Sequence, residues 1–289
     1  MVIPLVAAGP VGSGQVDEAA VVRLAQAEGA RVRQELETVL VAPDCRHALG
    51  RLQEAGVLAV VLPEVDATVG LTSEGGRQHK DVWAHTAQVV AQCPARPTVR
   101  WAGLLHDIGK VETREFKADG TVTFLGHAEA GAAMFRERIA GRLAFPRAQA
   151  RDLYDLIRHH QRAGQYNLGW GDSAVRRYYR EMGASLPDLL DLSRADVTSR
   201  IPGRRPEAMR LIADLARRIE ALKEADARVP PLPAGLGDAI MERFGLAPGP
   251  RIGRLRRALD QAVAAGDMKP RQRAEYYLDC LERSGLIDE

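Results

Sequence analysis

Residues that could bind a metal ion are concentrated in the middle of this 289-residue chain. Six of its seven histidines fall within one block, namely His79, His85, His106, His127, His159 and His160. Imidazole nitrogens together with carboxylate oxygens form a mixed ligand set that suits transition metals, whereas magnesium and calcium prefer oxygen ligands alone. The composition of this block therefore predicts a site for a divalent transition metal: Mn, Ni, Co, Fe or Zn.

The adjacent pair His106 and Asp107 is the centre of this prediction. It follows the apolar run VRWAGLL and precedes Gly109, so one helix terminus can direct both side chains at one ion. His85 in DVWAHTAQVV and Asp196 in LLDLSRADVTS complete the set if their helices pack antiparallel around the same point. Taken singly, each residue could be structural, because a buried histidine is usually a hydrogen-bonded core residue and Asp196 could pair two helices.

The elements that position these residues are predicted to be helices. Aromatic residues make up only 5% of the chain, and apolar residues recur at spacings of three and four. We expect a helix between Asp17 and Pro43 and a second between Asp44 and Pro63. The segment REFKADGTVTFLGH alternates around an Asp-Gly pair, which is typical of a tight β-hairpin.

The last third of the chain contains breaks and one basic cluster. The motif IPGRRPE interrupts the pattern, a helix is expected from Glu207 to Ala227, and VPPLPAG then forms a stiff connector. Beyond it, RIGRLRRAL places four arginines near one face of a short helix: Arg251, Arg254, Arg256 and Arg257. This cluster could contact the phosphates of a nucleic acid.

Charge and cysteine content exclude several classes of protein. The formal net charge of only +2 gives no global basic field, so any nucleic-acid surface must be local. Cys45, Cys93 and Cys280 are odd in number and have no CxxC spacing, which argues against a disulfide framework or thiolate zinc site and favours the cytoplasm. The apolar opening segment is too short to span a membrane, so no membrane association is expected. The sequence leaves the oligomeric state undetermined.

The chain order of the candidate ligands resembles the HD phosphohydrolase superfamily. More specifically, the sequence is similar to the C-terminal half of bacterial CCA-adding tRNA nucleotidyltransferases. The motifs that carry this resemblance are RVRQELETVL, GVLAVVLPEV, DVWAHT, WAGLLHDIGK, DGTVTFLGHAEAGA, DSAVRRY, RADVTSR and MERFGLAPGPRIGRL. No segment before Asp17 could hold a nucleotidyltransferase domain, so we expect no CCA addition.

The resemblance implies an all-α fold, with an HD-domain helical bundle and one short β-hairpin. The implied regions are a flexible tail at 1–16, a helical neck-like region at 17–78, the HD domain at 79–200 and an arm-like helical region at 201–289. It also implies transition-metal-dependent hydrolysis of 2',3'-cyclic phosphates, 2'-phosphates or related phosphoesters of nucleotides or RNA 3'-ends, tRNA among them.

The ligand set, together with the resemblance, suggests roles for individual residues. Water activated by the metal would attack phosphorus, with Asp107 orienting the water and His127 protonating the departing ribose oxygen. Lys110, assisted by Arg114, could contact the substrate phosphate, although a lysine at a helix C-terminus could equally compensate the helix dipole. Further substrate contacts are implied at Arg176, Arg177 and Arg194, while ion pairs on a helix surface would explain the first two equally well.

Three alternatives remain open at this point. His127 and the pair His159 and His160 could bind a second metal, or they could position substrate and cap a helix, so one or two ions are expected. The ligand order also resembles HD-GYP cyclic-di-GMP phosphodiesterases, but their Gly-Tyr-Pro is missing from HHQRAGQYN. The protein could instead be a non-catalytic tRNA- or RNA-binding module with a structural metal, or a nucleotide or deoxynucleotide phosphatase.

Overall fold

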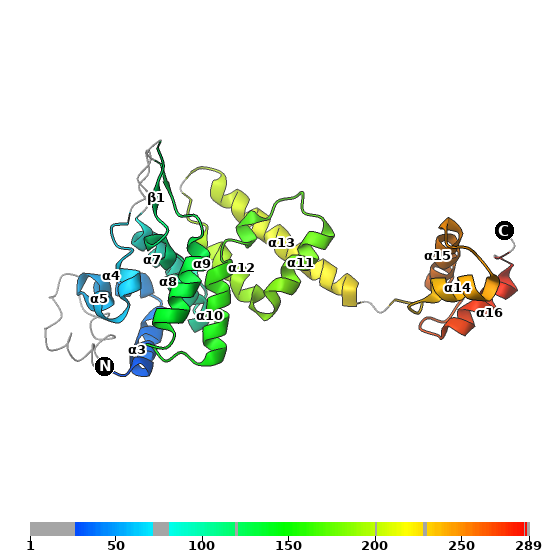
Figure 1. Ribbon diagram of the computed structural model, residues 1–289, viewed down its shortest axis with the longest axis horizontal. Helices are drawn as coiled ribbons and strands as arrows, with labels where there is room; N and C mark the ends of the chain where they lie inside the picture. Colours follow the sequence, from blue (N-terminus) through cyan, green and yellow to red (C-terminus); the bar gives the residue numbers. More distant parts are fainter. Residues whose placement is uncertain are drawn as a thin grey trace. The chain divides into compact units, whose positions relative to one another are not determined.

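The computed structural model describes residues 27–71, 81–118, 121–199, 201–227, 230–285 and 287. Most of these residues lie in helices, and a single two-stranded sheet lies among them (Figure 1). The all-α prediction with one short hairpin is therefore confirmed. The tail at 1–16 and the start of the first expected helix at Asp17 lie outside the described residues.

The N-terminal part of the described chain forms four helices: α3 (Gly29–Val41), α4 (Cys45–Glu54), α5 (Val57–Val61) and α6 (Pro63–Asp66). The sequence pattern predicted one continuous helix from Asp44 to Pro63, and this prediction is wrong. Gly56 adopts a left-handed conformation with φ of 72° and separates α4 from α5. Pro63 begins α6 as well as ending the preceding pattern, because the first turn of a helix tolerates proline.

The central part of the chain forms a helical bundle that contains the adjacent pair His106 and Asp107. Its elements are α7 (Val82–Gln92), α8 (Pro97–Leu105), η1 (Ile108–Val111), β1 (Glu115–Phe116), β2 (Val122–Thr123), α9 (His127–Met134), η2 (Phe135–Ile139), α10 (Arg147–His159), η3 (Ala163–Gln165), α11 (Asp172–Met182), η4 (Gly183–Ser185), α12 (Leu186–Asp196) and α13 (Arg204–Ala227). Helix α13 begins at Arg204, earlier than the predicted Glu207. Pro206 is compatible with this start, because a backbone N–H in the first turn of a helix has no helical partner.

Helix α8 is the core of this bundle. It packs against α3, α7, α10 and α12, and every residue from Val99 to Leu105 is buried. Trp101 is fully buried, and its indole N–H donates to Glu37 Oε1 of α3 at 3.1 Å. Such complete burial fixes the helix from all sides, so its C-terminal end, where His106 follows, is held in a defined position.

The hairpin is short and antiparallel. Glu115 pairs with Thr123 and Phe116 pairs with Val122. The expected turn residues Asp119 and Gly120 lie outside the described residues.

The chain divides into two compact units after Glu220. In the second unit, α14 (Leu236–Phe244), α15 (Pro250–Ala265) and α16 (Ala274–Ser284) surround a core of their own that includes Leu236, Leu259 and Tyr277.

Cys45, Cys93 and Cys280 are buried free thiols. Within the described residues, no helix is both long and apolar enough to cross a membrane.

Candidate metal centre

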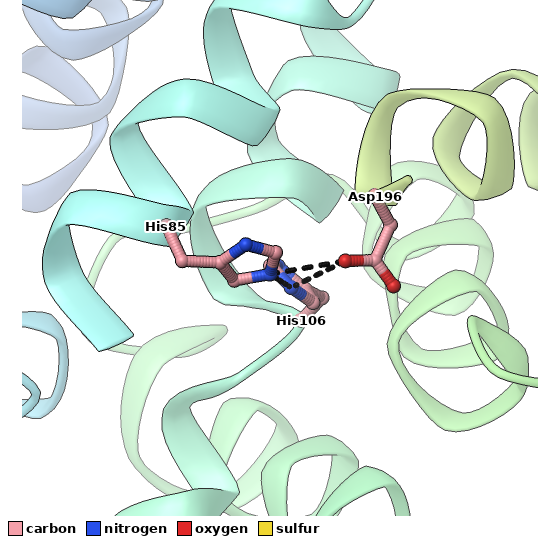
Figure 2. Close-up of side chains that lie close together, drawn as sticks. All are labelled: His85, His106 and Asp196. Carbon is pink, nitrogen blue, oxygen red and sulfur yellow. Dashed lines mark hydrogen bonds and ion pairs between the residues drawn. The ribbon is translucent and has the colours of Figure 1, made fainter. Parts of the chain in front are cut away.

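Three helix ends bring together the first group of ligands. His85 comes from α7, His106 directly follows α8, and Asp196 is the last residue of α12. The Nε2 atom of His85 lies 3.0 Å from Asp196 Oδ1 and 3.3 Å from His106 Nε2. His106 Nε2 lies 3.7 Å from the same carboxylate oxygen. Figure 2 shows the two imidazoles and this carboxylate directed at one another.

Asp107 connects this first group to a second one. Its Oδ2 atom lies 3.2 Å from His106 Nε2, while its Oδ1 atom lies 3.4 Å from His127 Nε2. His127 Nε2 in turn lies 3.3 Å from His160 Nε2. The candidate ligand atoms within each group, His85, His106 and Asp196 in the first and Asp107, His127 and His160 in the second, all lie within 4.8 Å of one another. The two oxygens of Asp107 thus face different groups.

In three of the four imidazole rings, a backbone carbonyl determines which nitrogen is free to bind a metal. His106, His127 and His160 each donate from Nδ1 to a carbonyl three residues earlier, at 2.8, 2.7 and 2.7 Å. A carbonyl can only accept, so Nδ1 carries the proton and Nε2 keeps its lone pair in the neutral ring. In His85, Nδ1 lies 3.0 Å from the hydroxyl of Thr198. This arrangement is typical of histidines that bind metals through Nε2.

Burial and charge act in opposite directions on the groups of the centre. Burial favours the neutral carboxyl of Asp107, but His106, His127 and Lys110 together hold its pKa well below the usual range. Burial also favours a neutral His106, yet Asp107 and Asp196 raise its pKa overall. For His160, burial and the neighbouring His106 lower the pKa to about 4. Asp107 is therefore ionised and His160 is neutral near pH 7, as metal ligands must be.

The donor set fits a transition metal. Pairs of Nε2 atoms lie only 3.3 Å apart, and two lone pairs at that distance repel each other unless a cation or proton lies between them. Each group combines two imidazole nitrogens with one carboxylate, a mixture suited to Mn, Fe, Co, Ni or Zn. Both groups can therefore hold a divalent metal.

Lys110 lies beside the centre. Its Nζ atom is 2.6 Å from Asp107 Oδ2 and 5.6 Å from the ring centroid of Phe124. Together with His85 and Asp196, both residues line a cavity of about 760 Å³. The ammonium group of Lys110 is thus held next to the candidate ligands, where a substrate phosphate could reach it.

The other predicted residues belong to neither ligand group. His159 is only partly buried and belongs to neither ligand group, although it precedes His160. Arg114 stacks on Phe116 with its guanidinium carbon 4.7 Å from the ring centroid. Arg177 and Arg194 pair with Glu181 and Asp191 at 3.9 and 2.7 Å. Neither these residues nor Arg176 is among the described residues that line the cavities at the centre.

Sequence reasoning missed two residues that contact the ligands. Thr198 holds His85, and the side-chain amide of Gln161 lies 3.3 Å from His127 Nε2. Each lies next to a recognised motif, Thr198 two residues after Asp196 and Gln161 directly after His160. Polar residues beside a ligand motif were the signal that could have identified them.

Comparison with known proteins agrees with this geometry. The family model described as "HD domain" matches residues 82–201, which include the four candidate ligands predicted from the sequence: His85, His106, Asp107 and Asp196. The chain carries an HD domain. A second model, described as "Probable RNA and SrmB- binding site of polymerase A", matches residues 18–68. The HD domain therefore follows a segment similar to an RNA-binding region.

Similar proteins include two tRNA nucleotidyltransferases. The A-adding enzyme of Deinococcus radiodurans is 35% identical over 259 residues, which cover 86% of this chain and 57% of that protein. The CC-adding enzyme of Thermus thermophilus is 35% identical over 254 residues, covering 86% and 56%. The multifunctional CCA protein of Halorhodospira halophila is 40% identical over 138 residues. The chain is homologous to these enzymes but spans little more than half the length of the first two.

Proposed function

We propose that this HD domain is a transition-metal-dependent phosphohydrolase acting on 2',3'-cyclic phosphates, 2'-phosphates or related phosphoesters of nucleotides and RNA ends. One observation carries the proposal: four imidazole Nε2 atoms and two buried or partly buried carboxylates converge beside a cavity that also contains Lys110. This arrangement combines metal ligands with a cation for the phosphate at a single point.

The residues of the centre have distinct roles in the proposed reaction. A bound divalent ion lowers the pKa of water from 15.7 toward about 7 and neutralises phosphate charge. Asp107, ionised and held by Lys110, would both bind the ion and orient the attacking water. Lys110 contacts the non-bridging phosphate oxygens as a point charge. The apolar neighbours Val82, Val122 and Phe124 restrict water around the phosphate.

His127 has two mutually exclusive roles, and the number of bound ions distinguishes them. If each ligand group holds an ion, Asp107 would be shared between the groups, and His127 and His160 would complete the second group. With one ion in the first group, His127 is free to protonate the departing ribose oxygen. We favour two ions, because His127 and His160 already present unprotonated Nε2 atoms to each other.

RNA is the proposed macromolecular partner. The matched relatives are named for tRNA, and one matched model is named for RNA binding. In α15, Arg254, Arg256 and Arg257 are exposed, whereas Arg251 is partly buried and donates to the carbonyl of Ile287. Three of the four arginines predicted to contact phosphate are thus accessible. These observations also favour the second candidate function, a non-catalytic RNA-binding module in which the metal is structural.

Substitution of the HD pair tests the proposal. His106→Ala and Asp107→Ala should abolish hydrolysis of 2',3'-cyclic AMP, 2'-AMP and 3'-AMP. Each variant lacks one metal ligand and should therefore bind the metal weakly. Circular dichroism should show helical content close to that of the unchanged chain. His47→Ala is the matched control, since His47 is exposed and belongs to neither ligand group.

The two candidate functions give different results in this experiment. Turnover that is present in the unchanged chain and in His47→Ala but absent from both HD variants would support the phosphohydrolase. Full activity in either HD variant would contradict it. Metal binding without turnover of any substrate, combined with RNA binding, would favour the non-catalytic module.

A further inference from the structure

Two cavities adjoin the candidate metal centre, and part of their lining is shared. The first, of about 760 Å³, is lined by His85, Lys110 and residues from the hairpin and the first turns of α13. The second, of about 400 Å³, is lined by His160 and residues from the loop that follows α10. Both volumes fall within the roughly 300–1,000 Å³ typical of small-molecule sites.

The lining shared by the two cavities includes one candidate ligand of the metal centre, Asp196. Four residues line both cavities: Asp196, Val197, Ala208 and Leu211. The first cavity contains His85 of the first ligand group, whereas the second contains His160 of the second group. A phosphate bound at the ligands would therefore lie next to both cavities.

The cavities differ in chemistry. Lys110 and Arg204 line the first, together with Phe124, so it can take a charged group and an aromatic ring. Among the described residues that line the second, none is a lysine or arginine. Its polar groups include the amides of Gln161 and Gln165, and its apolar walls include Ala163 and Ile212. Amides both donate and accept hydrogen bonds, which suits an uncharged group such as a nucleobase.

We propose that the substrate phosphate is a diester with a nucleoside on each side, one nucleoside in each cavity. The inference rests on the proposed phosphohydrolase function and specifies its substrate class. In the reaction, a water oxygen forms a bond to phosphorus and the bond from phosphorus to the ribose oxygen of one nucleoside breaks. The departing oxygen takes a proton from the medium or the attacking water, which leaves a nucleotide and a nucleoside.

A nucleoside 2',3'-cyclic phosphate would use only part of this site. It carries one nucleoside, so one cavity stays filled with water and contributes no binding energy. A dinucleoside monophosphate such as ApA fills both cavities. Binding energy that is available in the transition state raises kcat/KM, and we therefore expect the ratio of kcat/KM for ApA over 2',3'-cyclic AMP to exceed about tenfold, which corresponds to about 1.4 kcal/mol.

Filling the second cavity tests the inference. Gly164 lines this cavity, and a Cβ atom built on it would meet nothing within 4 Å, so Gly164→Phe can place a ring there without a backbone clash. The matched control is Gly141→Phe, because a Cβ at Gly141 also meets open space and Gly141 lines neither cavity. The ratio of kcat/KM for ApA over that for 2',3'-cyclic AMP should fall about tenfold or more in Gly164→Phe. In Gly141→Phe the ratio should equal that of the unchanged chain.

The outcomes separate this inference from the proposed function. A chain that hydrolyses 2',3'-cyclic AMP but not ApA, or a ratio that Gly164→Phe leaves constant, would overturn the inference alone. Absence of turnover with either substrate would overturn both. If circular dichroism shows that Gly164→Phe is unfolded, Gln165→Trp replaces it, because Gln165 is an exposed residue of the same lining. The same fall in ratio is expected of Gln165→Trp, and a constant ratio would again overturn the inference.

Discussion

Each histidine of the second ligand group is oriented by a backbone carbonyl three residues earlier in the chain. His127 and His160 both donate from Nδ1 to this carbonyl, which directs Nε2 away from it and toward Asp107. No other side chain is needed to select the tautomer. The ring of His160 is buried among other ionisable groups, with its pKa lowered to about 4 by burial and by His106, so it remains a neutral ligand at physiological pH.

The adjacent histidines provide a prediction at this scale. His160→Ala removes a ligand of the second group, and the metal content measured by mass spectrometry of the purified protein should fall from two ions to one. His159→Ala should leave the metal content at two, because His159 belongs to neither ligand group. Equal metal content in the two variants would contradict the assignment of His160.

At the scale of elements, the centre depends on a close approach between η1 and α9. A Cβ atom on Gly109 would lie 2.1 Å from the carbonyl oxygen of His127 and 2.4 Å from the backbone nitrogen of Gly131. Only glycine permits this contact. The contact sets how near Asp107, which precedes η1, lies to His127, which begins α9.

Gly109→Ala should therefore separate the two elements. The free energy of unfolding should decrease by about 1–3 kcal/mol or more, as expected for overpacking a site without room, and the second ion should bind more weakly. Urea denaturation and metal titration measure these effects. Gly141→Ala is the control, because a Cβ atom there meets open space. Similar stability of the two variants would show that η1 and α9 can move apart without cost.

Packing between elements also explains what the sequence could and could not predict. Chain order predicted His85, His106, Asp107 and Asp196 as ligands, and the structure brings these four side chains close together at helix ends. The choice between His159 and His160 could not be made, because consecutive helical residues point about 100° apart and the packing of α10 decides which one faces α9. The pattern likewise predicted a helix after Ile201, but only the fold shows that its first turns line a cavity beside Asp196.

At the scale of the whole molecule, two compact units have separate cores. The unit up to Glu220 contains the candidate metal centre, and the unit after it contains the arginines of α15. Hydrolysis of a small nucleotide should require only the first unit, whereas RNA affinity should also depend on the exposed arginines of the second. The homology to tRNA nucleotidyltransferases extends over both.

Neutralising two of these arginines tests the division of roles. The double variant Arg254→Gln and Arg257→Gln should bind RNA more weakly, with a salt dependence shallower by about 1–2 in log–log slope, while its turnover of 2',3'-cyclic AMP stays constant. Arg243→Gln is a matched control in the same unit, because Arg243 already pairs with Glu282 at 3.0 Å. Equal RNA affinity in both variants would assign the α15 arginines a structural role.

The most direct measurement is hydrolysis of 2',3'-cyclic AMP by the metal-stripped protein before and after metal is added back. Chelation should abolish product formation, and Mn, Ni, Co or Zn should restore it more effectively than Mg, because imidazole nitrogens bind transition metals in preference to magnesium. Asp107→Ala should remain inactive with every metal. Turnover that persists in the metal-stripped protein, or in Asp107→Ala, would contradict a metal-dependent reaction at this centre.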